Sequence, residues 1–97
     1  MYLILLNYKV PIEEVERVNP AHRAFLDQAR KADKLLVSGP KVPRSGGVIV
    51  ALTKTREEVD QLIDEDPFFQ EKIADYEVIE FQAFKFHPTL SGLVQGK

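Results

Sequence analysis

The order in which two kinds of hydrophobic pattern follow each other constrains the fold of this chain more than any other feature. Four runs are rich in aliphatic, β-branched or aromatic residues without helical spacing, which is typical of strands. Two longer runs carry apolar residues at helical spacing. We therefore expect strands at residues 2–8, 35–37, 48–52 and 76–86, and helices at about 19–33 and 55–66.

The resulting order, β-α-β-β-α-β, predicts an α+β fold of the ferredoxin-like kind, with a four-stranded sheet and both helices on one face. The two helices run antiparallel in this topology. The first turn of one therefore lies at the same end of the sheet as the last turn of the other. The length predicts one domain over residues 1–97, in which residues from about 87 to 97 carry little pattern and form a tail or arm.

The expected start of the first helix is the pair Asn19-Pro20, a capping side chain followed by proline at the first helical position. The preceding residues, 9–18, fit either a short helix or a structured loop. The inward stripe of the helix is expected to contain Ala21, Phe25, Ala29 and Ala32. His22 lies three residues before Phe25, so we expect it to face inward as well.

The end of the second helix carries an acid where its apolar stripe continues. Val59, Leu62 and Ile63 form the stripe, and the next position on it is Asp66. Pro67 disfavours helical geometry for the residue before it, which predicts a helix boundary there. The carboxylate is thus expected at a helix end and pointing inward, although a simple turn with solvent-facing acids fits the spacing equally well.

The topology brings His22 and Asp66 to the same end of the sheet. A histidine facing a carboxylate in a partly dry pocket is a general acid–base unit, in which the acid orients the imidazole. The alternative is a buried polar pair that only satisfies its own hydrogen bonds. The ends of two strands arrive at the same place, and the residues expected to bind a substrate there are Tyr8, Leu26, Ser38, Gly39, Pro40 and Phe68.

Three segments together resemble the YCII-related family: Asn-Pro-Ala-His-Arg-Ala-Phe-Leu at 19–26, Leu-Leu-Val-Ser-Gly-Pro at 35–40 and Asp-Glu-Asp-Pro-Phe at 64–68. The resemblance implies a dimeric α+β barrel and an active pair at His22 and Asp66. It also implies chemistry similar to that of enzymes that remove chloride from chlorinated hydroxyaromatics, or of muconolactone isomerases. This chain departs from the family in its compact hairpin at 43–47 and in the tail after His87.

The strands also predict a homodimer that forms through the sheet faces. Strand 2–8 is apolar on both sides, with Ile4 and Leu6 on one side and Leu3 and Leu5 on the other. Strand 48–52 shows the same two-sided pattern. Helices cover only one face, so a monomer would expose a large apolar patch, which soluble monomers seldom do.

Several other classes of site and partner are not expected. A net charge of −2 and the absence of aromatic residues from strand 48–52 argue against nucleic-acid binding. The chain contains no cysteine and only two histidines, and no ligand spacing predicts a metal or a cofactor. Nucleophilic catalysis would require Ser38 or Ser45 beside His22, and Ser38 is the nearer candidate. No stretch is long enough to span a membrane, and a cytoplasmic protein is expected.

Two hypotheses about function follow. The first is a small enzyme that uses His22 and Asp66 for proton transfer on a small cyclic or aromatic substrate, as an isomerase, lyase or dehydrochlorinase. The second is a non-catalytic module that binds a small ligand in the same pocket, for example in a stress response. Turnover of a substrate panel separates the two.

Overall fold

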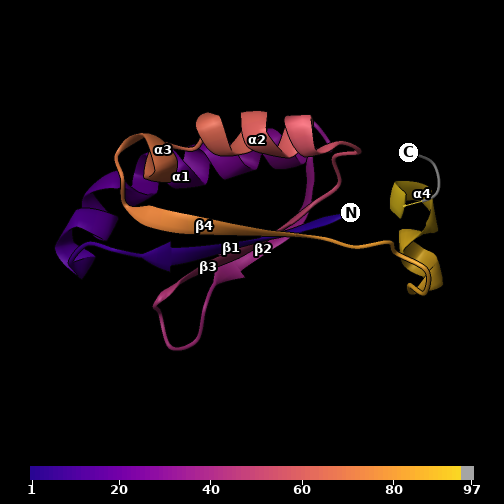
Figure 1. Cartoon of the computed structure of the whole chain (residues 1–97), viewed down its shortest axis with the longest axis horizontal. Helices are drawn as coiled ribbons and strands as arrows, with labels where there is room; N and C mark the ends of the chain where they lie inside the picture. The colour runs from indigo at the N-terminus through magenta and orange to yellow at the C-terminus, as the bar shows by residue number, and fades with distance from the viewer. Residues whose placement is uncertain (95–97) are drawn as a thin grey trace.

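A computed structural model describes residues 1–94 as an antiparallel sheet with α1, α2 and α3 on one face (Figure 1). The sheet order is β2-β3-β1-β4, and every neighbouring pair is antiparallel. This arrangement confirms the predicted ferredoxin-like α+β fold. The elements are β1 Tyr2–Tyr8, α1 Ile12–Lys31, β2 Leu35–Pro40, β3 Gly46–Ala51, α2 Arg56–Asp64, α3 Pro67–Gln70, β4 Ala74–Glu80, the 3-10 helix η1 Pro88–Leu90 and α4 Ser91–Val94.

The core lies between the helices and one face of the sheet. Tyr2, Ile4 and Leu6 alternate along β1 and are each at most 2% exposed. They pack with buried side chains of α1 and α2, such as Val15 and Val59. This alternation is what a sheet covered on one face requires, since successive strand side chains point to opposite faces.

The prediction that the first helix starts at Asn19-Pro20 is wrong, because α1 begins at Ile12 and contains Pro20 in its interior. An internal proline removes one backbone hydrogen bond and costs about 3 kcal/mol. Val15 and Val18 are buried ahead of it, and burying each side chain returns about 1.5–3 kcal/mol. Packing thus outweighs the local preference, and α1 changes direction between its first turns and the rest (Figure 1).

The buried face of α1 also differs from the predicted stripe. Ala21 and Ala32 are exposed, whereas Asn19, which was expected to be a cap, is buried together with His22 and Ala29. The earlier start of the helix does not change its phase, so His22 faces inward as predicted.

The strands end where a neighbouring strand is no longer present to pair with them. The predicted strand 76–86 is wrong at both ends, because β4 spans Ala74–Glu80. Its last pair joins Glu80 to Tyr2, and the next backbone bond runs from Phe81 N to Met1 O, where the neighbouring strand begins. β2 is longer than predicted and includes Pro40, which an edge strand tolerates because one side of its backbone is unpaired.

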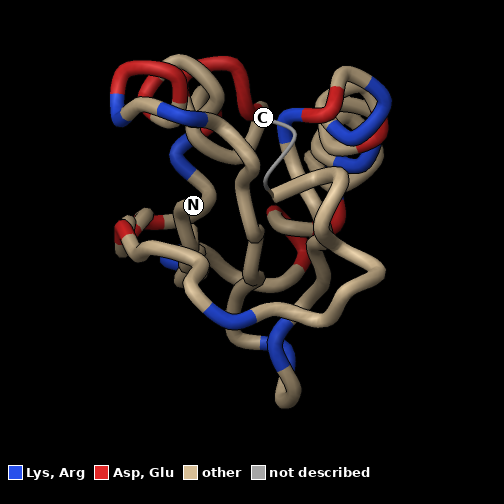
Figure 2. Tube along the Cα trace, turned by 90° about the vertical axis from the view of Figure 1, so that its right-hand side faces the viewer, with Lys and Arg blue, Asp and Glu red and all other residues tan. Residues whose placement is uncertain are grey.

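The tail expected at 87–97 contains η1 and α4, which lie beyond the end of the sheet (Figure 1). The last three residues of that predicted tail lie outside the described residues. Charged residues of both signs are concentrated on the helices (Figure 2). Strands β1, β2 and β3 carry no charged residue, whereas β4 carries Asp75, Glu77 and Glu80. No helix within residues 1–94 is long and apolar enough to cross a membrane.

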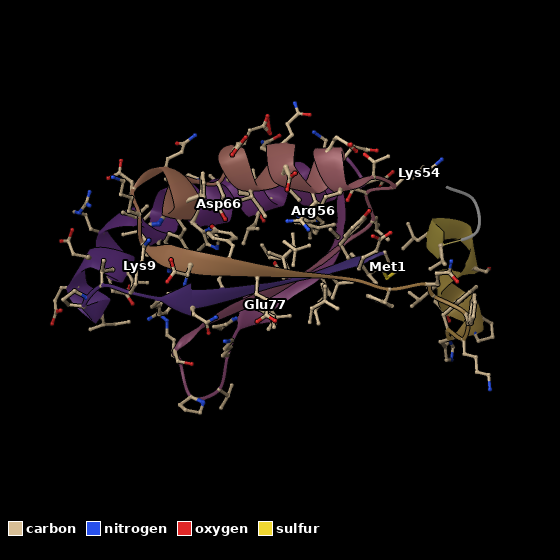
Figure 3. The ribbon with its side chains drawn as sticks, in the orientation of Figure 1. Met1, Lys9, Lys54, Arg56, Asp66 and Glu77 are labelled. Carbon is tan, nitrogen blue, oxygen red and sulfur yellow. The ribbon has the colours of Figure 1, made fainter. Side chains whose placement is uncertain are left out.

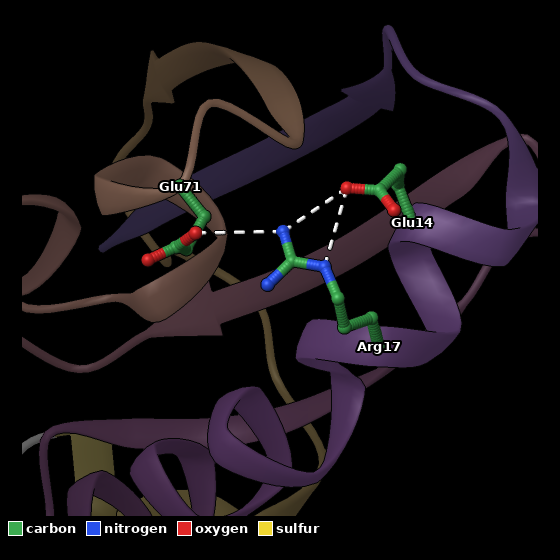
Figure 4. A network of polar contacts seen from close by, with 3 residues as sticks. All are labelled: Glu14, Arg17 and Glu71. Carbon is green, nitrogen blue, oxygen red and sulfur yellow. Dashed lines mark hydrogen bonds and ion pairs between the residues drawn. The ribbon is translucent and has the colours of Figure 1, made fainter.

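An exposed network links α1 to the residue after α3. Arg17 contacts Glu14 at 3.1 Å and Glu71 at 3.5 Å (Figure 4). All three side chains are about half exposed, so the pairs contribute little to stability, about 0–1 kcal/mol each.

Gly46 marks the closest approach of β3 to β1. A Cβ added there would overlap the carbonyl oxygen of Leu6, whereas one added at Gly39 would meet nothing within 4 Å. We therefore expect Gly46→Ala to lower the free energy of unfolding by about 1–3 kcal/mol, as overpacking does. Urea unfolding measures this, with Gly39→Ala as the control. Equal stability of the two variants would contradict the close approach.

Candidate active site

Asp66 occupies the N-cap of α3 and is 1% exposed. Pro67 follows at the first helical position, and Asp66 has extended backbone geometry, as the sequence predicted for a residue before proline. Its Oδ1 accepts a hydrogen bond from Phe68 N at 3.0 Å. The side chain lies between the helical layer and the sheet (Figure 3). The acid is therefore fixed by the start of a helix and shielded from water.

His22 lies in the middle of α1, and its Nδ1 is 2.7 Å from Asp66 Oδ1. The imidazole also stacks on Phe68, with ring centroids 3.8 Å apart and planes 6° apart. Because an ionised carboxylate can only accept, Nδ1 carries the hydrogen in this contact. The predicted proximity of His22 and Asp66 is thus present. The catalytic roles of the two residues remain predictions.

Tyr76, on β4, completes the surroundings of the acid. Its hydroxyl donates to Asp66 Oδ2 at 2.6 Å. Burial, followed by the charge of Asp66 and this hydrogen bond, raises the pKa of Tyr76, so the phenol stays neutral and acts as a donor. Alternation along β4 could have placed this side chain on the helix-facing side, because Tyr76 pairs across the sheet with buried Leu6.

A cavity of about 320 Å³ opens beside the imidazole between α1 and the sheet. His22 and all six residues predicted to bind a substrate line it: Tyr8, Leu26, Ser38, Gly39, Pro40 and Phe68. Asp66 is not among the lining residues, so it lies behind the imidazole. Ser38 reaches the cavity wall, but within residues 1–94 it makes no hydrogen bond with His22.

Charged side chains at the cavity were not predicted. Arg23 and Asp27 from α1 and Arg44 from the β2–β3 loop contribute to its lining. Arg44 is paired with Glu16, while Arg23 forms no ion pair within the described part of the chain. Within residues 1–94, no group of three or more histidine, aspartate or glutamate side chains is placed so that it could hold a metal ion.

Comparisons with known proteins identify a family and a fold. The family model described as YCII-related domain matches residues 1–82. No curated protein matches the chain. Among solved structures, it is similar to 5-chloro-2-hydroxyhydroquinone dehydrochlorinase from Burkholderia phenoliruptrix AC1100, in complex with 2,5-dihydroxybenzoquinone. The TM-score is 0.70 and the identity 18%, with 84% of this chain and 93% of that chain covered. This likeness supports the ferredoxin-like fold of the dimeric α+β barrel type.

Proposed function

This chain belongs to the YCII-related family, and from that premise we propose that it is a small enzyme that transfers protons on a small cyclic or aromatic substrate. His22 is the group that exchanges the proton with the substrate, and Asp66 holds the His22 imidazole in position. The observation that carries the proposal is the 2.7 Å contact between His22 Nδ1 and the buried Asp66 carboxylate beside a cavity.

The contact supports a specific division of labour between the two ring nitrogens. Nδ1 donates its hydrogen to Asp66, which leaves Nε2 as the nitrogen with a free lone pair in the neutral ring. A positive charge that forms on the imidazole during proton transfer is stabilised by the carboxylate behind it. This is the arrangement that a general base requires.

The cavity wall indicates the substrate class. Apolar and aromatic side chains, including Leu26, Tyr8 and Phe68, suit a flat ring. Arg44 and Asp27 at this cavity are paired with Glu16 and Arg30, so Arg23 supplies the positive charge that no acid within residues 1–94 offsets. That charge favours a substrate that carries or develops an oxyanion. Isomerisation, elimination and loss of HCl from a ring all pass through such a state. The structurally similar dehydrochlorinase takes a substrate of this kind.

The test is a turnover panel that includes 5-chloro-2-hydroxyhydroquinone and a muconolactone. Loss of HCl from the first compound moves a proton from a hydroxyl to the carbon that bears chlorine, and a second proton leaves with chloride. No oxidant is needed, and both chloride and the quinone product can be measured. We expect at least one panel compound to be turned over. A compound that raises the melting temperature but is never transformed would instead favour the small-ligand binding module.

We also propose a homodimer formed through the open sheet faces. Val37 on β2 and Ile79 on β4 are 55% and 42% exposed, and they flank the half-buried Leu3 and Val50 across the sheet. The four side chains form one apolar row on the face that the helices leave uncovered. A two-fold stack of two such faces would remove the row from water.

Light scattering is expected to give twice the 11.1 kDa chain mass at micromolar concentration. Ile79→Lys should shift the mass to that of one chain, because it places a charge inside the proposed interface. Val42→Lys is the control, since Val42 is 97% exposed in the β2–β3 loop. A wild-type mass of one chain would refute the dimer.

A further inference from the structure

We propose that Tyr76 is a positioning residue for His22 and acts through Asp66. The proposal rests on the proposed function, in which His22 exchanges the proton. Tyr76 is not among the residues that line the cavity, so it has no direct route to a substrate. Its hydroxyl reaches only the far oxygen of the acid, at 2.6 Å.

The two oxygens of Asp66 have different partners. Oδ1 accepts from Phe68 N and from His22 Nδ1, whereas Oδ2 accepts from the Tyr76 hydroxyl. The terminal torsion of an aspartate is broad and weakly restrained by itself. A donor on each oxygen fixes the plane of the carboxylate. Tyr76 therefore helps to hold Oδ1 against the imidazole, and this contact keeps the hydrogen on Nδ1.

The phenol is itself held in place. It lies on the helix-facing side of β4, and its ring makes a T-shaped contact with Phe69, with ring centroids 5.7 Å apart and ring planes at 83°. Because burial, above all, raises its pKa, the Tyr76 hydroxyl keeps its hydrogen near neutral pH and does not exchange protons itself. What remains for it is to donate one hydrogen bond in a fixed direction.

Tyr76→Phe removes that hydrogen bond and keeps the ring. We expect kcat to fall about 10-fold, in line with other groups that orient a reacting histidine, while KM changes less than about 2-fold. Tyr2→Phe is the matched control. Tyr2 is 2% exposed and lies on the same face of the sheet, but it is not in contact with the cavity or Asp66. Its kcat should equal that of the wild type.

The decisive measurement is a double-mutant cycle with Asp66→Asn on the panel compound that is turned over. If Tyr76 acts through Asp66, Tyr76→Phe should change kcat by less than about 2-fold in the Asp66→Asn background. The same 10-fold loss in both backgrounds would overturn the proposal, as would a fall in kcat for Tyr2→Phe as large as for Tyr76→Phe.

A second readout does not depend on activity. In ¹⁵N NMR of the histidine rings at neutral pH, the wild type should show Nδ1 of His22 protonated, and Tyr76→Phe should show a mixture of both tautomers. An unchanged His22 spectrum in a folded variant would refute the positioning role. If no panel compound is turned over, the proposed function fails while this measurement still decides the role of Tyr76.

Discussion

His22→Ala is expected to reduce turnover of the active panel compound by about 10²–10⁴-fold, the range typical of a general acid or base. The His22 imidazole lines the cavity, and the buried Asp66 carboxylate holds it in place, with Asp66 Oδ1 2.7 Å from His22 Nδ1. Without it, Asp66 cannot substitute, because it lies behind the cavity wall and is 1% exposed. Steady-state kinetics with kcat and KM determined separately measures the loss.

The control for this experiment is His87→Ala. His87 lies at the start of η1, where its Nδ1 accepts from Thr89 N, and it does not line the cavity. Its removal should leave kcat unchanged. A His22→Ala protein that remains folded and keeps more than about a tenth of wild-type kcat would rule out His22 as the proton carrier.

Asp66→Ala is expected to lower the free energy of unfolding by about 3–5 kcal/mol. The carboxylate accepts hydrogen bonds from His22, Phe68 and Tyr76, and alanine would leave all three donors without a partner. Each buried donor left without an acceptor costs about 1–3 kcal/mol, and the lost N-cap alone accounts for about 1 kcal/mol. Urea unfolding followed by circular dichroism gives the difference.

Asp64→Ala provides the comparison, since Asp64 is an exposed acid two residues away on α2. Asp64→Ala should change the free energy of unfolding by no more than about 0.5 kcal/mol. Asp66→Asn should lose less stability than Asp66→Ala, because the amide oxygen still accepts. Equal losses for Asp64→Ala and Asp66→Ala would show that the three hydrogen bonds do not stabilise the fold.

The sequence predicts the topology well because the strand and helix periods are clear, but it misleads where long-range packing decides. Asn19-Pro20 has the form of a helix start, and only the burial of Val15 and Val18 against the sheet carries α1 through the proline. The residues after Glu80 have strand-like composition, but they pass beyond the start of β1 and find no pairing strand.

The residues of the candidate site likewise fall into those that the sequence could predict and those that depend on long-range packing. His22 and Asp66 could be paired from topology alone, because each continues an inward helix stripe. Tyr76 could not, since a tyrosine on a strand fits the core equally well, and only the 2.6 Å contact distinguishes the two roles. Arg44 comes from the β2–β3 loop, and its position depends on a loop path that local patterns do not encode.

The double role of Asp66 restricts how the chemistry of this chain can diverge. A substitution of Asp66 lowers the stability of the fold and also removes the group that orients His22. Replacement of this carboxylate during evolution is therefore unfavourable. The β2 edge and the loop at 41–45 form the opposite case, because Ser38 and Arg44 are exposed and their replacement leaves the core intact. New substrate preferences should therefore arise at that edge, and libraries for directed evolution are best concentrated there.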